Sequence, residues 1–280
     1  MTRVVIALGG NALLLNGERR DDAFMFYAMI TGKIKTSMEY EQIIKDIETL
    51  NDEAKTGMYD VTAISANAYA SFNEVYALTR SGASFGLSYG PMVVAKSQVD
   101  FAKAVVGSPG PGTSSELLFK MFVNKNANIR PMRFDTIPDA VLKGEIDAGI
   151  VIHDEQLTFQ NKGLIKVVDL YEKWKNYAGN LPVPLGFNAI RKSLGKEVIA
   201  NYITDFENSI KYALEHTEEA ARYAMKYARY QDLELETRFI KMYVNDLSVN
   251  FGDSGRRALE MYYKKANEMQ LLPKFEMEIV

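Results

Sequence analysis

The 280-residue sequence has no cysteine, which excludes disulfide bonds, thiolate nucleophiles and sulfur-ligated metal ions. It has no basic excess either: the formal net charge is −3, so there is no positive field to bind nucleic acid or an anionic membrane. Uninterrupted apolar runs of about 18 residues, which a membrane-spanning helix needs, are also missing. We therefore expect a globular protein whose partner is a small molecule, with no nucleic-acid and no membrane partner.

Motifs that signal a bound metal or nucleotide are missing too. The sequence contains no P-loop, no HExxH pair, no EF-hand loop and no dinucleotide fingerprint after a strand, so we predict neither a metal site nor a cofactor. The apolar start is interrupted by Asn11 and is followed by no small-residue cleavage site, so it does not predict an export signal. We expect a cytoplasmic protein.

The sequence does contain a repeated order of elements. Gly57 and Asp60 recur at the same spacing as Gly144 and Asp147, and an apolar, β-branched strand follows each Asp. The two glycines are predicted to end helices in the left-handed conformation. Each half is predicted to run strand–helix–strand–helix–strand, and this alternation favours parallel sheets with helices on both faces.

Apolar strands over residues 90–98 and 181–191 are predicted to connect the two halves. Beyond Ser193 the chain is predicted to form long amphipathic helices that pack onto the first half. We therefore predict an α/β fold with two lobes and a cleft between them. Lobe 1 would comprise 1–91 and 188–280, and lobe 2 would comprise 92–187.

Candidate site residues follow the predicted strands, because ligands of parallel sheets bind at the carboxyl ends of the strands. His153 directly follows one buried strand, and Ser65 ends the strand in the corresponding place of the other half. An imidazole with a pKa of about 6.5 exchanges a proton near neutral pH, so His153 is a candidate general base, although a structural role also fits a single histidine. Asp154 and Glu155 lie beside it in the sequence. The other histidine, His216, is interpreted as structural because it lies near a predicted helix end.

A second candidate lies where a loop enters a helix in the second half. Gly112 allows close approach of the backbone, and Thr113 and Ser114 supply hydroxyl groups at the start of the helix. Free N–H groups and hydroxyls there suit a carboxylate, whereas ordinary helix capping explains the same residues. Asp22 lies at the start of the equivalent helix of the first half, where acidic residues are common.

From residue 21 onward the chain carries a series of blocks in a fixed order: DDAFMFYAMITGKI, DIETLN, YGPMVVAK, AGIVIHDEQLTF, VVDLYEKW and LPVPLGFNAIRK. Together these blocks resemble the 1,4-dihydroxy-6-naphthoate synthases of the futalosine pathway to menaquinone. The resemblance implies the two-lobed fold of type II periplasmic binding proteins, in which each lobe is a βαβαβ-based sheet with flanking helices. It also implies a lyase that converts cyclic de-hypoxanthine futalosine to the dihydroxynaphthoate without a cofactor.

The same resemblance implies roles for individual residues. His153 corresponds to the proposed catalytic histidine of the family, which would remove a substrate proton and start the fragmentation. Thr113 and Ser114 correspond to a hydroxyl pair that contacts the substrate, a small carboxylate. Ser65 and Asp22 correspond to cleft positions of the first lobe.

Residues 1–20 depart from this pattern. The stretch RVVIALGGNALL instead resembles the opening of carbamate kinases, in which a Gly-Gly-Asn turn approaches phosphate, but no other kinase block follows. Two further functions stay open on the sequence: a chorismate dehydratase-like enzyme of the same pathway, and a small-carboxylate-binding protein without catalysis, because a fold does not dictate a function. The sequence does not predict the oligomeric state.

Overall fold

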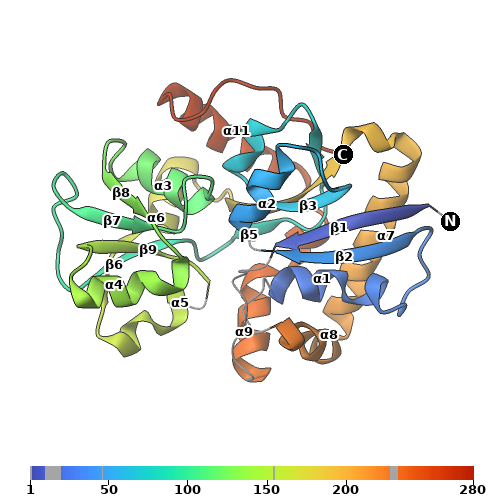
Figure 1. Cartoon of the computed structure of the whole chain (residues 1–280), viewed down its shortest axis with the longest axis horizontal. Coiled ribbons are helices and arrows are strands. Elements are labelled where there is room, and N and C mark those ends of the chain that lie inside the picture. Colours follow the sequence, from blue (N-terminus) through green and yellow to red (C-terminus); the bar gives the residue numbers. More distant parts are fainter. Residues whose placement is uncertain (1, 10–19, 46, 154, 228–232) are drawn as a thin grey trace. The chain divides into compact units, whose positions relative to one another are not determined.

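A computed structural model describes the chain except for residues 1, 10–19, 46, 154 and 228–232. The chain divides into two compact units, each with its own β-sheet (Figure 1). Unit 1 comprises Met1–Phe85, Gly186–Asp253 and Phe275–Val280. Unit 2 comprises Gly86–Leu185 and Ser254–Lys274.

The sheet of unit 1 has the order β2-β1-β3-β11-β4, with β5 also paired to β11. β1 is parallel to β2 and β3, whereas β11 runs antiparallel to β3 and β4. The strands are β1 (Arg3–Gly9), β2 (Glu39–Lys45), β3 (Val61–Ser65), β4 (Tyr76–Leu78), β5 (Ser84–Gly86) and β11 (Val183–Arg191). The helices are α1 (Arg20–Ile30), α2 (Ile47–Ala54), α7 (Lys196–Glu215), α8 (Thr217–Ala224), α9 (Leu233–Tyr243) and α10 (Asp246–Val249), with short 3-10 turns at Ala68–Ser71, Lys192–Leu194 and Met225–Tyr227.

Helices cover both faces of this sheet because the chain moves from β1 outward to β2 and then back past β1 to β3. Right-handed crossovers in opposite directions place α1 and α2 on opposite faces. Alternate residues of β1 accordingly face different cores: Val4 and Ile6 join the core around α1, and Ala7 joins the core around α2. α7 and α8 pack against α1, where the rings of Phe26 and Phe206 stack at 4.1 Å between centroids (Figure 1).

The sheet of unit 2 has the order β10-β6-β9-β7-β8. β7 is parallel to β8 and β9, and β6 runs antiparallel to β9 and β10. The strands are β6 (Met92–Ala95), β7 (Val105–Ser108), β8 (Asn128–Pro131), β9 (Ala148–Val151) and β10 (Ile165–Asp169). The helices are α3 (Ser114–Phe122), α4 (Ile137–Lys143), α5 (Glu155–Thr158), α6 (Leu170–Ala178) and most of α11 (Gly252–Glu268), with 3-10 turns at Phe134–Thr136 and Phe159–Lys162.

The predicted repeat is confirmed by the element order β1-α1-β2-α2-β3 in unit 1 and β7-α3-β8-α4-β9 in unit 2. The repeated aspartates accept the same kind of backbone hydrogen bond in both units. Asp60 Oδ2 accepts a hydrogen bond from Val5 N at 2.9 Å, and Asp147 Oδ2 accepts one from Val105 N at 2.7 Å. Each aspartate therefore ties the start of the third strand of its half to the first strand.

The repeated glycines also adopt the predicted conformation. Gly144 is the C-cap of α4 with a φ of 76°, and Gly57, which follows α2, has a φ of 68°. Only glycine adopts this left-handed region without strain, so both helices can end and turn toward the next strand within a few residues.

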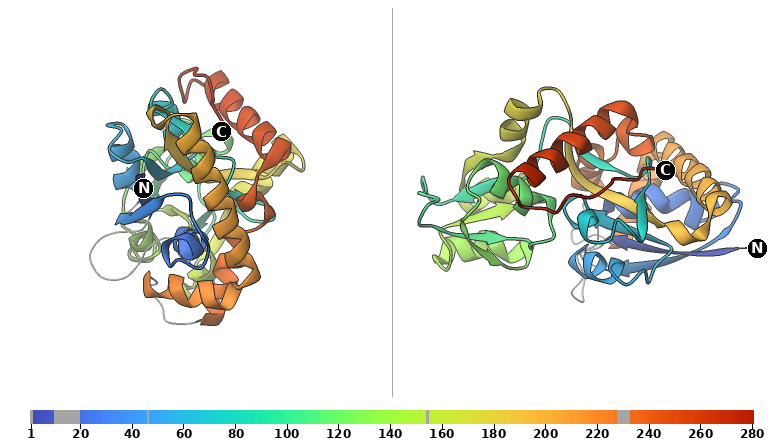
Figure 2. Two further views of the ribbon diagram at one scale, coloured as in Figure 1. Left: turned by 90° about the vertical axis from the view of Figure 1, so that its right-hand side faces the viewer. Right: turned by 90° about the horizontal axis from the view of Figure 1, so that it is seen from above.

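The C-terminal helices divide between the units, which corrects the expectation that all of them pack onto the first lobe. α7 to α10 belong to unit 1, but Ser254–Lys274, which holds most of α11, belongs to unit 2. The Tyr262 ring of α11 lies 6.2 Å from the ring of Trp174, and both side chains are fully buried. The last residues, Phe275–Val280, return to unit 1 (Figure 2). Among the described residues, no helix combines the length and the apolar character needed to cross a membrane.

Candidate functional site

The carboxyl edge of the sheet in unit 2 brings together two of the predicted groups. β7 and β9 are parallel neighbours, so the residues that follow them share one edge of the sheet. His153 follows β9, and the loop with Gly112 and Thr113 follows β7 and leads into α3. The predicted base and the predicted anion-binding loop therefore lie at the edge where ligands of parallel sheets bind.

His153 has a backbone conformation that few residues with a side chain adopt. Its φ is 54°, in the left-handed region, and its carbonyl accepts a hydrogen bond from Gln156 N at 3.1 Å, at the start of α5. The half-buried ring meets Phe134 edge-on, with 5.5 Å between ring centroids. Such a conformation costs about 1–3 kcal/mol and is found most often at functional sites. A partly exposed imidazole fixed at a strand end has the access that proton transfer requires.

Of the two acidic residues that follow His153, the structure describes only Glu155. Asp154 lies outside the described residues. Glu155 is buried, with its Oε2 at 3.7 Å from Lys162 Nζ, and Lys162 also pairs with Asp139 at 2.9 Å. The Lys162 ammonium therefore balances the charge of the Glu155 carboxylate within unit 2.

Thr113 caps α3, as one of the two interpretations of the sequence predicts. Its Oγ1 accepts a hydrogen bond from Glu116 N and donates one to the carbonyl of Gly110 at 2.7 Å. Thr113 is buried, so its hydroxyl already serves the fold. It therefore holds the loop and the helix start in place.

Ser114, the first residue of α3, is also buried, and its Oγ donates a hydrogen bond to the carbonyl of Leu185 at 2.5 Å. The backbone is what the helix start offers to a ligand. The N–H groups of Ser114 and Ser115 precede the hydrogen bonds of the helix and donate to no other described residue. Together with half-exposed Gly112, they form an N-terminus suited to a carboxylate.

A buried acid, which the sequence reasoning did not single out, stabilises this loop. Ser108 Oγ donates to Glu116 Oε2 at 2.6 Å and accepts a hydrogen bond from Gly110 N at 3.2 Å. Lys120 pairs with Glu116 at 2.5 Å and balances its charge. The sequence contains a pattern that marks Glu116: it lies three residues after Thr113, which is the spacing of a capping box.

The carboxyl edge of unit 1 holds Ser65, the last residue of β3, whose N–H donates to Asn51 Oδ1 at 3.1 Å. Asp22 lies in the first turn of α1, and its side chain lies outside the described part of the chain. The sequence reasoning missed Asn51, although an amide one turn after Ile47 stands out on the buried face of an amphipathic helix. Asn51 Nδ2 is buried and has no hydrogen-bond partner among the described residues.

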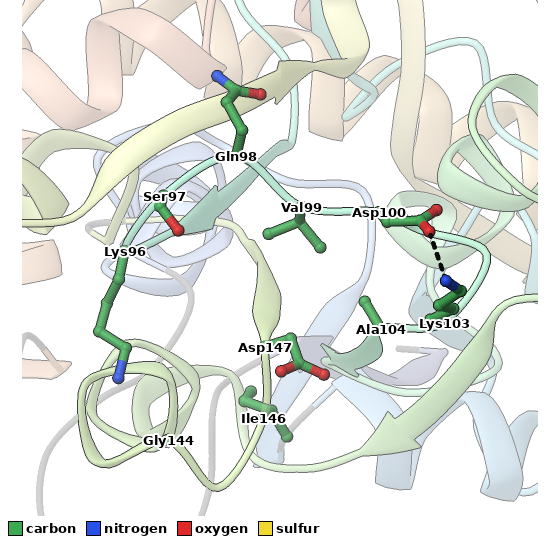
Figure 3. A pocket seen from close by; sticks show the side chains of 10 residues that line it. All are labelled: Lys96, Ser97, Gln98, Val99, Asp100, Lys103, Ala104, Gly144, Ile146 and Asp147. Atoms are coloured by element: carbon green, nitrogen blue, oxygen red, sulfur yellow. Dashed lines mark ion pairs between the residues drawn. The ribbon is translucent and has the colours of Figure 1, made fainter.

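A pocket of about 440 Å³ in unit 2 does not coincide with these residues. It is lined by residues that precede β7 and β9 or follow β6, among them Lys96 and Asp147 (Figure 3). It therefore lies at the amino edge of the parallel strands, opposite to the edge that holds His153. Its charges balance, and Lys103 pairs with Asp100 at 3.9 Å (Figure 3), so the lining does not select a ligand of either sign.

The carboxyl edge of unit 2 thus holds an imidazole, a group able to exchange a proton near neutral pH, and the start of a helix, a place suited to an anion. In the part of the chain that the structure describes, no three His, Asp or Glu side chains are grouped so that they could hold a metal ion.

Comparison with known proteins shows the family to which the chain is related. A family described as menaquinone biosynthesis matches residues 18–268. The chain belongs to this family. It is 33% identical to a 1,4-dihydroxy-6-naphthoate synthase of Thermus thermophilus over 247 residues, which are 88% of this chain and 90% of the relative. The resemblance carried by the sequence blocks is thereby confirmed. The family match begins after the stretch that resembles carbamate kinases, and residues 10–14 of that stretch lie outside the described residues.

Solved structures agree with this membership. A crystal structure of a protein from Archaeoglobus fulgidus is 42% identical and superposes with a TM-score of 0.89, covering 96% of this chain and 98% of that protein. A Candida albicans protein described as having the generic periplasmic binding protein fold is 14% identical, with a TM-score of 0.66 and 95% of each chain covered. At that identity the likeness shows the fold alone. The predicted periplasmic-binding-protein-like fold is confirmed.

Proposed function

We propose that this member of the menaquinone biosynthesis family is a lyase that converts cyclic de-hypoxanthine futalosine to 1,4-dihydroxy-6-naphthoate. The name of the Thermus relative and the sequence blocks support the substrate. The observation that carries the chemistry is the position of His153 and the first amides of α3 on one edge of the sheet in unit 2.

In this proposal the substrate carboxylate binds at the N-terminus of α3. The N–H groups of Ser114 and Ser115 donate to it, and the helix dipole favours its charge. His153 then accepts a proton from a carbon of the substrate, and the electron pair of that C–H bond drives cleavage of the carbon skeleton by elimination. For Ser65 and Asp22, the family resemblance alone supports a role in substrate binding.

Conversion of the substrate by the purified protein tests this function. We expect release of the dihydroxynaphthoate, followed by chromatography, when cyclic de-hypoxanthine futalosine is supplied, and no turnover when chorismate is supplied in a parallel reaction. Turnover of chorismate instead would identify a dehydratase. Tight binding of either acid without any product would identify a carboxylate-binding protein, and both outcomes contradict the proposal.

A further inference from the structure

Phe134 lies at the same edge of the unit 2 sheet as His153. It follows β8, which is parallel to β7, and β7 is parallel to β9, the strand that precedes His153. The ring of Phe134 meets the imidazole edge-on, with 5.5 Å between the ring centroids and 83° between the ring planes. Aromatic rings at this distance attract one another, and edge-on contact is one of their preferred arrangements. The outer parallel strand, β8, therefore also leads to a group at this edge, and that group contacts the candidate base.

The turn that carries Phe134 is closed by hydrogen bonds. The Arg133 carbonyl accepts one from the N–H group of Thr136 at 3.0 Å and one from the Thr136 hydroxyl at 2.8 Å. The Phe134 carbonyl accepts one from the N–H group of Ile137. These bonds complete a single 3-10 turn, so the backbone at Phe134 has a defined conformation.

The same turn is packed onto the strand that leads to His153. Ile137, which follows the turn, is fully buried in the core of unit 2. A Cβ added to Gly149 of β9 would lie 2.1 Å from Ile137 Cγ2, so the absence of a side chain at Gly149 lets Ile137 approach the strand closely. The turn with Phe134 and the base His153 are therefore both held by β9, and this shared support fixes the distance between their rings.

Core packing does not account for the position of the Phe134 ring. The ring is half-buried, and it is not among the residues that form or flank the core around Ile137 and Val141. The ring contact that the structure shows for it is with the imidazole of His153. A half-exposed ring gains less from burial than a core phenylalanine, so the contact with the imidazole is its specific interaction.

We propose that Phe134 is a positioning residue of the active site, which holds the imidazole of His153 in the orientation that removes the substrate proton. The proposal rests on the function proposed above. A base takes a proton efficiently only when its ring nitrogen lies within hydrogen-bond reach of that proton, and a small misplacement slows the reaction. The imidazole can rotate about its side-chain bonds, and the Phe134 ring blocks part of that rotation. Phe134 itself exchanges no proton and acts through His153.

The variants Phe134→Ala and Phe134→Tyr test this role by steady-state kinetics with cyclic de-hypoxanthine futalosine. We expect Phe134→Ala to lower kcat about twofold to tenfold, as for loss of one aromatic pair, and to leave the KM nearly unchanged. Phe134→Tyr keeps the ring and should keep the wild-type kcat.

Phe101→Ala is the matched control for the loss of a ring. Phe101 is also half-buried in unit 2 and meets another ring, that of Phe119, edge-on at 5.5 Å between centroids. It precedes β7 and so lies away from the edge that holds His153. We expect Phe101→Ala to keep the wild-type kcat. Equal losses of kcat in the two alanine variants, or a raised KM with unchanged kcat in Phe134→Ala, would overturn the positioning role.

The reactivity of the imidazole gives a second measurement, which needs no turnover. Diethyl pyrocarbonate acylates histidine side chains, and the chain has only two, His153 and His216, whose peptides mass spectrometry separates. We expect His153 to react about twofold to tenfold faster in Phe134→Ala, because an imidazole that is free to rotate exposes its nitrogens more often. His216 should react at its wild-type rate. An unchanged rate at His153 would overturn the proposal.

The two measurements distinguish failure of this proposal from failure of the proposed function. If the wild type does not turn over cyclic de-hypoxanthine futalosine, the function fails, and the reactivity of His153 in Phe134→Ala still decides whether Phe134 holds the ring. If the wild type turns over the substrate while Phe134→Ala changes neither kcat nor the reactivity of His153, only the positioning role fails.

Discussion

Unit 1 and unit 2 have the same parallel core, β2-β1-β3 in one and β8-β7-β9 in the other, and in each an antiparallel strand lies beside the third strand. They differ beyond the end of that third strand. In unit 1 Ser65 is buried and bound to Asn51, whereas in unit 2 His153 is half-buried with a left-handed backbone. The two units therefore share their framework and differ in the groups at the strand ends, where only unit 2 presents an imidazole. In the proposed function, proton transfer is accordingly assigned to unit 2 and substrate binding to unit 1.

Substitution at the two strand ends should give the largest contrast. We expect His153→Ala to lower kcat about 10²- to 10⁴-fold, as for loss of a positioned base, and Ser65→Ala to raise the KM a few-fold with kcat nearly unchanged. Steady-state kinetics with cyclic de-hypoxanthine futalosine measure both. His216→Ala is the control, because His216 is exposed and stacks on Tyr212, and it should keep the wild-type rate. Equal losses of kcat for the His153 and Ser65 variants would contradict the assignment of proton transfer to unit 2 and of binding to unit 1.

The shared aspartates should differ in what they contribute to stability. Asp60 is half-buried and also pairs with Arg191, whereas Asp147 is exposed. We expect Asp60→Ala to lower the free energy of unfolding by about 2–4 kcal/mol and Asp147→Ala by about 1 kcal/mol. Urea denaturation measures both, with circular dichroism for the whole chain and the fluorescence of Trp174, the single tryptophan, for unit 2. A larger loss for Asp147→Ala would contradict the account of the shared framework.

The repeated glycines should show the smallest difference. Gly57→Ala and Gly144→Ala each place a side chain at a positive φ, so we expect each to cost about 1 kcal/mol of stability. Gly57→Ala should cost slightly more, because its Cβ would lie 3.2 Å from Val75 Cγ1, against 3.7 Å from Lys96 Nζ at Gly144. Thermal unfolding of the two variants checks the order. A neutral Gly144→Ala would show that the left-handed turn is not needed to end α4.

The strands and helices that the two units share could be predicted from the sequence, because the residues that mark their ends act locally in the chain. Gly144 needs only its own backbone conformation, and Asp147 is followed at once by the strand that it helps to pair. The alternation of short apolar strands with helices then fixes a parallel sheet and its carboxyl edge. For this reason His153 and Thr113 could be placed on one edge before the structure was known.

The contacts that complete the site could not be predicted, because they join residues that are far apart in the chain. Ser114 gives no sign that its hydroxyl is bound to Leu185. An amphipathic helix such as α11 has an apolar face, but its sequence does not say which surface that face covers, so Tyr262 was expected in the wrong lobe. Asn51 was detectable as a polar residue on an apolar face, whereas its bond to Ser65 was not.

The most direct measurement of the central claim is chemical rescue of His153→Gly. Glycine suits the φ of 54° at this position, so the variant removes the ring without straining the backbone. We predict that turnover of cyclic de-hypoxanthine futalosine is lost and that added imidazole restores part of it with saturation, because the free base occupies the place of the side chain. Full turnover by His153→Gly without imidazole would contradict the assignment of His153 as the base.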